Sequence, residues 1–155
     1  MANMIQYAKE QVSRVIAQAY EKAAAAGALP GGVAVKGTVE IPKDPKNGDY
    51  AASFAMAGAK AMKMAPRAIA QALVDHMDLG DTPFASVEIA GPGFLNFRLG
   101  HRWYGQVLSA IESEGALYGQ SQEGQGKRVM VEFVSANPTG PMHMGNARGG
   151  VLGDT

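Results

Sequence analysis

The chain has 155 residues, 46% of them hydrophobic, so it can bury a core and is not expected to be disordered. It contains no cysteine, which excludes a disulfide framework and a thiolate metal site, and we expect no bound metal. Its 14 basic residues balance 14 acidic ones, so no global charge is expected to attract nucleic acid. The sequence has neither an apolar stretch of membrane length nor a signal-peptide pattern, so we expect a cytoplasmic protein without a membrane partner.

The first third of the chain has the pattern of a helix followed by a strand. Apolar residues at helical spacing predict an amphipathic helix over residues 3–25, which Gly27 and Pro30 end. Residues 33–41 are rich in β-branched side chains and predict a strand. Residues 42–49 consist of turn-forming types, so we expect a loop there.

Two further helices are predicted after this loop. We expect Asp49 to cap a helix over residues 50–63, because an aspartate accepts the free N–H groups of a first helical turn. Pro66 suits a first helical position, and the helix that it begins is predicted to end near residue 77.

Two short strands and a helix complete the first predicted domain. The strands cover residues 86–90 and 94–99 and are joined by a Gly-Pro-Gly turn, and a helix follows over residues 101–114. Together, these elements predict an α+β domain over residues 1–115, with helices packed on a small antiparallel sheet.

The composition changes after this domain. Residues 116–127 are polar and glycine-rich and predict a linker. Residues 128–134 have the apolar character of a buried parallel strand, and a helix is predicted from near Met142. We therefore expect residues 128–155 to be the first β-α of a Rossmann-type nucleotide-binding domain that the chain does not complete; the alternative is that the last helix packs back on the first domain.

The junction between this strand and helix has features of a phosphate site. The start of a helix offers free backbone N–H groups and a partial positive charge. His143 and Asn146 are three residues apart, so both are expected on one face of the first turn. Gly145 allows a ring or phosphate to approach the backbone, and Pro138 and Pro141 stiffen the loop.

Residues 131–150 resemble the HIGH signature of class I aminoacyl-tRNA synthetases in the form found in the arginyl enzymes. The central motif consists of Ala136, Asn137, Pro138, Thr139, Gly140, Pro141, Met142, His143, Met144, Gly145 and Asn146. The sequences Pro-Lys-Asp at 42–44, Gly-Asp-Tyr at 48–50 and Gly-Pro-Gly-Phe-Leu-Asn-Phe at 91–97 are similar to the appended N-terminal domain of that family. The resemblance thus covers essentially the whole chain.

The resemblance implies an arginine–tRNA ligase, which activates arginine with ATP and transfers it to tRNA(Arg). It implies ATP with Mg²⁺ as a substrate, no tightly bound cofactor, and a monomer. It further implies that His143, Gly145 and Asn146 contact ATP, with His143 and Asn146 as catalytic residues, and that Glu132 and Asn137 hold arginine. The family has a second histidine where this chain has Asn146, which keeps a neutral donor but cannot carry a positive charge.

The resemblance also suggests a tRNA contact in the first domain. The equivalent sheet region approaches the tRNA elbow, where Asn96 can read a base edge and Phe94 or Phe97 can stack. The alternative is a strand asparagine that satisfies a neighbouring backbone group. Taken alone, His143 is also consistent with a surface or capping histidine, and Glu132 with the solvent side of a strand.

Two other functions remain open at this point. The chain can be a stand-alone module that binds the tRNA elbow without catalysis, or part of a different ATP-using nucleotidyl transferase. We expect residues 1–155 alone to be inactive in arginine activation, because half of the nucleotide-binding fold is missing from them.

Overall fold

The computed structural model describes residues 3–34, 36–120, 124, 126–137 and 139–154. The chain divides into two compact units, Met1–Gly119 and Gln120–Thr155, which are described separately below. In the described part of the chain, no helix has the length and apolar character needed to cross a membrane.

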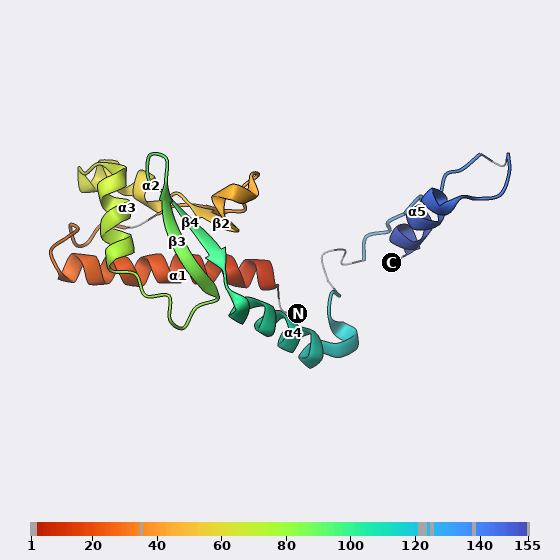
Figure 1. Ribbon diagram of the computed structural model, residues 1–155, viewed down its shortest axis with the longest axis horizontal. Helices are drawn as coiled ribbons and strands as arrows, with labels where there is room; N and C mark the ends of the chain where they lie inside the picture. The colour runs from red at the N-terminus through yellow and green to blue at the C-terminus, as the bar shows by residue number, and fades with distance from the viewer. Residues whose placement is uncertain (1–2, 35, 121–123, 125, 138, 155) are drawn as a thin grey trace. The chain divides into compact units, whose positions relative to one another are not determined.

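Unit 1 combines helices with a four-stranded antiparallel sheet, which confirms the α+β prediction (Figure 1). The order of the strands in the sheet is β1-β2-β4-β3. In chain order, the elements of unit 1 are α1 Met4–Ala25, β1 Val39–Glu40, a 3-10 turn Pro45–Asn47, β2 Tyr50–Ala52, α2 Phe54–Met62, α3 Pro66–Asp75, β3 Phe84–Ala90, β4 Phe94–Leu99, α4 His101–Glu114 and a 3-10 turn Gly115–Leu117.

Helix α1 forms as the sequence predicts. The Asn3 side chain accepts a hydrogen bond from the backbone N–H of Gln6 at 3.0 Å and so satisfies one free donor of the first turn. One face of the helix is buried, and it consists of Ala8, Val12, Val15, Ile16, Ala19 and Ala23. This apolar face packs on β1, β2 and α3.

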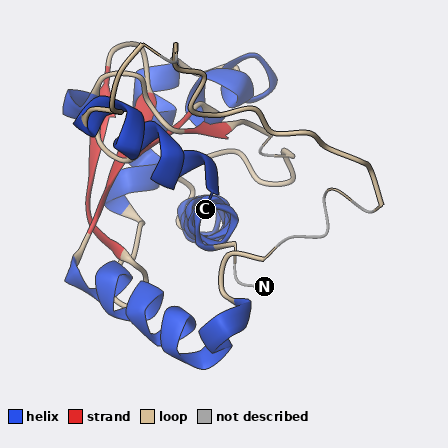
Figure 2. Cartoon of the chain, turned by 90° about the vertical axis from the view of Figure 1, so that its right-hand side faces the viewer, coloured by secondary structure: helices blue, strands red, loops and turns tan. Residues whose placement is uncertain are grey.

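Strand alternation divides the sheet into a core face and an open face. Leu95 and Phe97 of β4 have no exposed surface and pack among the helices, together with Tyr50 and Phe84 of the neighbouring strands. The Phe84 ring lies 5.1 Å from that of Phe97 and 6.4 Å from that of Tyr50, centroid to centroid. In Figure 2 the strands are drawn in red; Ala51 and Asn96 alternate with these core residues along β2 and β4, so their side chains lie on the opposite face of the sheet, which we call the open face.

Two predicted elements of unit 1 differ from the structure. Residues 50–52 form strand β2, not the first turn of a helix. Of the predicted strand 33–41, residues 39–40 are the ones paired among those that the structure describes, and Val35 lies outside the described residues. The expected cap was wrong because Asp49 contacts the sheet: its Oδ2 accepts the Leu99 N–H at 2.7 Å. Pairing with β4 outweighs the local helix preference of these residues.

Unit 2 contains one helix, α5 Met144–Asp154, among its described residues. The structure assigns no strand to residues 128–134, and Val129, Met130 and Val131 are exposed. An isolated strand has no partner for its backbone N–H and C=O groups, which explains why this segment is unpaired. The Rossmann-type continuation therefore stays a prediction.

Replacing Phe97 should destabilise the chain much more than replacing Phe94 on the same strand. Phe97→Ala leaves a cavity in the core and should lower the free energy of unfolding by about 3–5 kcal/mol. Phe94 is half-buried on the open face, so Phe94→Ala should cost less than half as much. Urea denaturation of both variants measures the difference, and equal losses would contradict the assignment of the two faces.

The stability of the chain should depend on Tyr50 at alkaline pH. Burial raises the pKa of the Tyr50 hydroxyl above its usual value, and the nearby Asp49 carboxylate raises it further. The contribution of Tyr50 is complete below the unfolded-state pKa of about 10 and is lost as the pH rises through the higher folded-state pKa. Tyr50→Phe should therefore flatten the fall in unfolding free energy above about pH 10, measured by urea denaturation, relative to the exposed control Tyr104→Phe. The same fall in both variants would contradict this.

Candidate functional site

The open face of the sheet carries a row of side chains that come from all four strands. The register pairs Glu40 with Ala51, Ala51 with Asn96, and Asn96 with Glu88. Because residues directly opposite each other in neighbouring strands share a face, these four side chains lie across the sheet in one line. Phe94 is two residues before Asn96 on β4 and therefore lies on the same face.

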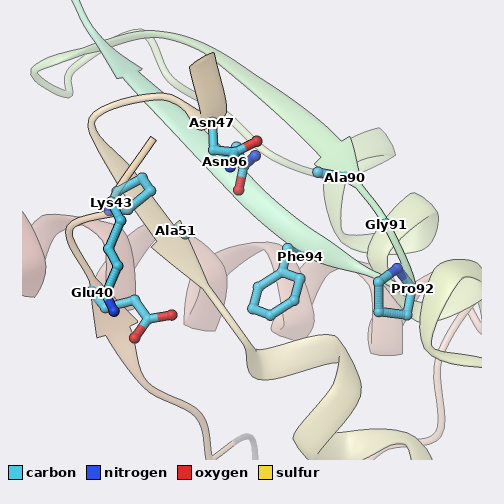
Figure 3. Close-up of a pocket in the computed structure, with 10 residues that line it drawn as sticks. Glu40, Lys43, Asn47, Ala51, Ala90, Gly91, Pro92, Phe94 and Asn96 are labelled. Carbon is cyan, nitrogen blue, oxygen red and sulfur yellow. The ribbon is translucent and has the colours of Figure 1, made fainter. Parts of the chain in front are cut away.

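A hollow of about 390 Å³ lies over this row (Figure 3). Its floor contains Ala51 and Asn96, which are 7% and 6% exposed although they are on the open face. The walls come from the loop before β2, from the β3–β4 turn and from the strand residues Glu40, Ala90 and Phe94. The full set is Glu40, Pro42, Lys43, Asn47, Ala51, Ala90, Gly91, Pro92, Phe94 and Asn96. The floor is therefore covered by two loops and not by a helix.

The loop before β2 is attached closely to β4. Gly48 has a φ of +87°, and a Cβ there would lie 2.7 Å from the carbonyl oxygen of Phe97, so this position requires glycine. Asp49 is bonded to the same strand twice, since its N–H donates to Phe97 O at 2.8 Å and its carboxylate accepts from Leu99. These contacts fix the end of the loop against the sheet.

The β3–β4 turn is attached to the start of α3. Gly93 has a φ of +140°, and a Cβ there would lie 3.0 Å from the backbone of Pro66. The Arg67 guanidinium donates to the carbonyl oxygen of Gly91 at 3.2 Å. The turn that carries Pro92 into the wall of the hollow is therefore held from α3.

The hollow has the chemistry of a site for a flat polar group. Figure 3 shows Phe94 in the hollow on the side of Pro92, with Asn47 and Asn96 at another part of it and Glu40 and Lys43 at the rim. Each asparagine amide offers both a donor and an acceptor, and the phenyl ring offers a surface for stacking. An aromatic face beside paired donor and acceptor groups is the pattern that binds an unstacked nucleobase.

Two of the three candidates from this sheet lie in the hollow, and one does not. Asn96 and Phe94 line it, whereas Phe97 is in the core on the opposite face and has no surface for stacking. Residues Glu40, Asn47 and Ala51 also line the hollow but did not stand out in the sequence. The strand register, which places Glu40 opposite Ala51 and Ala51 opposite Asn96, brings Glu40 and Ala51 into the site, and the loop before β2 brings Asn47.

In unit 2, the loop before α5 forms a second, smaller hollow. It measures about 220 Å³ and is lined by Ala136, Asn137, Thr139, Gly140, Pro141, Met142, His143 and Asn146. Pro138 of the predicted motif lies outside the described residues. Glu132 is exposed on the preceding segment and is not among the lining residues, so the structure brings Asn137, His143 and Asn146 together without Glu132.

The first turn of α5 is closed by a reciprocal pair of capping bonds. The His143 Nδ1 accepts the N–H of Gly145 at 3.1 Å, and the Asn146 side-chain oxygen accepts the N–H of His143 at 3.3 Å. Since Nδ1 is an acceptor, the hydrogen of the neutral ring lies on Nε2, which is then free to donate to a ligand. The capping alternative for His143 and a role in ligand binding are thus compatible.

Among the residues that the structure describes, no three His, Cys, Asp or Glu side chains form a group that could hold a metal ion.

Comparison with known proteins identifies the family. Residues 8–99 match the family model described as "Arginyl tRNA synthetase N terminal domain". The arginine–tRNA ligase of Acetivibrio thermocellus is 46% identical over 154 residues, which cover 99% of this chain and 27% of that protein. The arginine–tRNA ligase of Caldanaerobacter subterraneus is 47% identical, with the same two shares. The crystal structure of arginyl-tRNA synthetase from Plasmodium falciparum has a TM-score of 0.52 and 13% identity, covers 66% of this chain and 18% of that one, and shows a similar fold alone.

The chain belongs to the arginyl-tRNA synthetase N-terminal domain family, because the family model covers residues 8–99 of its 155. This confirms the resemblance seen in the sequence. The chain spans about a quarter of the length of the curated relatives that it matches, 27% in both cases.

Removing the Asn146 side chain should weaken the start of α5. Asn146→Ala leaves the N–H of His143 without its acceptor and should destabilise the first turn by about 0.5–2 kcal/mol. Faster amide hydrogen exchange and less helical Cα chemical shifts at residues 144–148 are the expected NMR result. Asn137→Ala is the control, because Asn137 lines the same hollow but makes neither capping bond; equal effects of both variants would contradict the capping role.

Proposed function

We propose that this chain provides the N-terminal part of an arginine–tRNA ligase, an aminoacyl-tRNA synthetase that activates arginine with ATP and transfers it to tRNA(Arg) during protein synthesis in the cytoplasm. The observation that carries the proposal is the match of residues 8–99 to the family model, with 46–47% identity to two arginine–tRNA ligases over nearly the whole chain. We also propose that the enzyme is a monomer.

The division of labour that we propose follows the change in sequence character. Residues 1–115 are the tRNA-recognition domain, residues 116–127 are a linker, and residues 128–155 open the Rossmann-type catalytic domain. The separation of the structure into two compact units after Gly119 supports a boundary near this linker. The apolar side chains of residues 129–131 are exposed, which supports the proposal that further strands and helices of the catalytic domain cover this segment.

In the first domain, the hollow on the open face of the sheet receives an unstacked base from the tRNA elbow. Phe94 stacks on the base, and the Asn96 amide bonds to its edge. The hollow supports this role because it places an aromatic ring and a buried amide of the same strand in one cavity. The balanced total charge of the chain is consistent with recognition through a local site.

At the loop before α5, His143, Gly145 and Asn146 contact ATP, while Glu132 and Asn137 hold arginine by its ammonium group. The Nε2–H of His143 is suited to a phosphate oxygen, because a fixed donor stabilises the charge that develops as the phosphorus becomes pentacoordinate. Such a donor contributes about 3–4 kcal/mol to lowering the barrier. In this proposal Asn146 acts through its position on the first helical turn, and Mg²⁺ arrives with ATP, bound by the phosphate oxygens.

Binding of tRNA(Arg) to the 155-residue chain tests the proposed recognition site. Phe94→Ala should weaken binding about 5- to 150-fold, because stacking on an aromatic ring contributes about 1–3 kcal/mol per base. Asn96→Ala should weaken it to a similar or smaller extent, measured by fluorescence anisotropy at fixed salt. Gln71→Ala, an exposed change on α3, is the control and should bind as the wild type does. Equal binding by all four proteins would contradict the proposed site.

The 155-residue chain by itself should show no ATP–pyrophosphate exchange in the presence of arginine and tRNA(Arg). The reason is that it spans 27% of the length of the ligases that it resembles. Exchange above the rate without protein would show that these residues are sufficient for activation, and it would contradict the proposed division of labour. A tRNA-binding module without catalysis would give the same negative result. The same exchange assay on the full-length gene product separates the two functions, because only a ligase shows arginine-dependent exchange.

A further inference from the structure

One wall of the hollow is a short loop whose position is not explained by its own secondary structure. Residues 43–47 end in a single 3-10 turn, Pro45–Asn47, in which the side chain of Asp44 accepts the Lys46 N–H at 3.0 Å. The Asn47 N–H donates to Asp44 O at 3.0 Å, and these are local bonds that hold the turn but not its place on the sheet. Asp49 fixes the end of the loop against β4, but residues 43–47 themselves need a further contact to hold their position over the sheet.

Arg98 provides this contact. It lies on β4 two residues after Asn96, so the two side chains are on the same open face of the sheet. The Arg98 Nη2 donates to the carbonyl oxygen of Lys46 at 2.8 Å across 52 residues of sequence. A charged donor at this distance makes a strong hydrogen bond, and its acceptor is the residue immediately before Asn47.

The held loop delivers a second amide to the hollow. Asn47 lines the hollow together with Asn96, and Figure 3 shows both side chains there. Within the described residues, neither side-chain amide makes a hydrogen bond, so both can bond to a ligand. Two amides supply two donor and acceptor pairs, which is enough to read two positions on the edge of a base.

We propose that Asn47 is a second recognition residue of the hollow and that Arg98 is a positioning residue, which holds the loop so that Asn47 lies beside Asn96. The proposal rests on the proposed function, in which an unstacked tRNA base enters the hollow. It assigns to Arg98 a role other than contact with tRNA phosphate. The two roles differ in what they predict for salt dependence, because only a phosphate contact releases counterions.

Amide hydrogen exchange tests the positioning role without tRNA. Arg98→Ala removes the donor to Lys46 O and should speed exchange of the Asn47 and Gly48 N–H groups about tenfold, the effect of losing one charged hydrogen bond. Lys46→Ala is the matched control. It also removes one positive charge, but it keeps both Arg98 and the carbonyl oxygen of residue 46, so exchange should stay at the wild-type rate. Unchanged exchange in Arg98→Ala overturns the positioning role, as does equal acceleration in both variants.

Binding of tRNA(Arg) at a series of salt concentrations tests how Arg98 and Asn47 act together. Arg98→Ala and Asn47→Ala should each weaken binding about tenfold. The double variant should bind about as tightly as either single variant, because both changes remove the same contact between Asn47 and the base. The slope of log affinity against log salt should be the same in Arg98→Ala as in the wild type. A slope shallower by about 0.7–0.9 would show a phosphate contact, and a multiplicative double variant would show independent roles; either overturns the proposal.

The two experiments separate this proposal from the proposed function. If the wild-type chain does not bind tRNA(Arg), the proposed function of the hollow fails, and the recognition role of Asn47 fails with it. Hydrogen exchange still decides whether Arg98 holds the loop. If the wild type binds and only the Asn47→Ala and Arg98→Ala results disagree with expectation, the proposed function stands and this inference is wrong.

Discussion

The pairing of β4 with strands on both sides is the constraint on which the rest of unit 1 depends. β4 is bonded to β2 and to β3, so its alternation fixes which side chains reach the helices and which do not. Leu95 and Phe97 fill the core, and as a direct consequence Phe94 and Asn96 must point away from it. A shift of one residue in this register would exchange the two sets, removing the core and the hollow together.

The same strand also organises the loops that surround the hollow. The loop before β2 is bonded to β4 through Asp49 and Arg98, and it passes so close to Phe97 that only glycine fits at position 48. The β3–β4 turn is held separately by Arg67 of α3. Because both walls are tied to rigid elements, the hollow exists before any ligand arrives, which reduces the entropy lost on binding.

The sequence predicted the helices α1 and α4 and the β3–β4 turn well, because the patterns that indicate them are local. The apolar stripe of α1, the Gly-Pro-Gly turn between β3 and β4, and helix α4 all appear at or near their expected residues. Residues 50–52 were assigned to a helix because their pairing with β4 is a contact across more than forty residues, which no local pattern contains. Phe94 and Asn96 could be proposed as tRNA contacts from the resemblance to a family. The roles of Asn47 and Arg98 could not, because they depend on contacts between residues that are far apart in the sequence. The loop before α5 could be predicted as a unit from its motif, whereas the reciprocal bonds between His143 and Asn146 are visible only in the structure.

The central claim is that the open face of the sheet, at the hollow, is where this domain meets tRNA. The most direct test is an NMR titration of the ¹⁵N-labelled 155-residue chain with tRNA(Arg), following the side-chain amide signals of Asn47 and Asn96 and the backbone signals of residues 91–94. Within that turn the signals to follow are those of Gly91, Gly93 and Phe94, because Pro92 has no backbone N–H. The account predicts that the largest changes are in the signals of the hollow, while the exposed face of α1 at Glu10 and Glu21 stays as in the free protein. Changes centred on α1 or α4, with the signals of the hollow unaltered at saturating tRNA, would contradict the account.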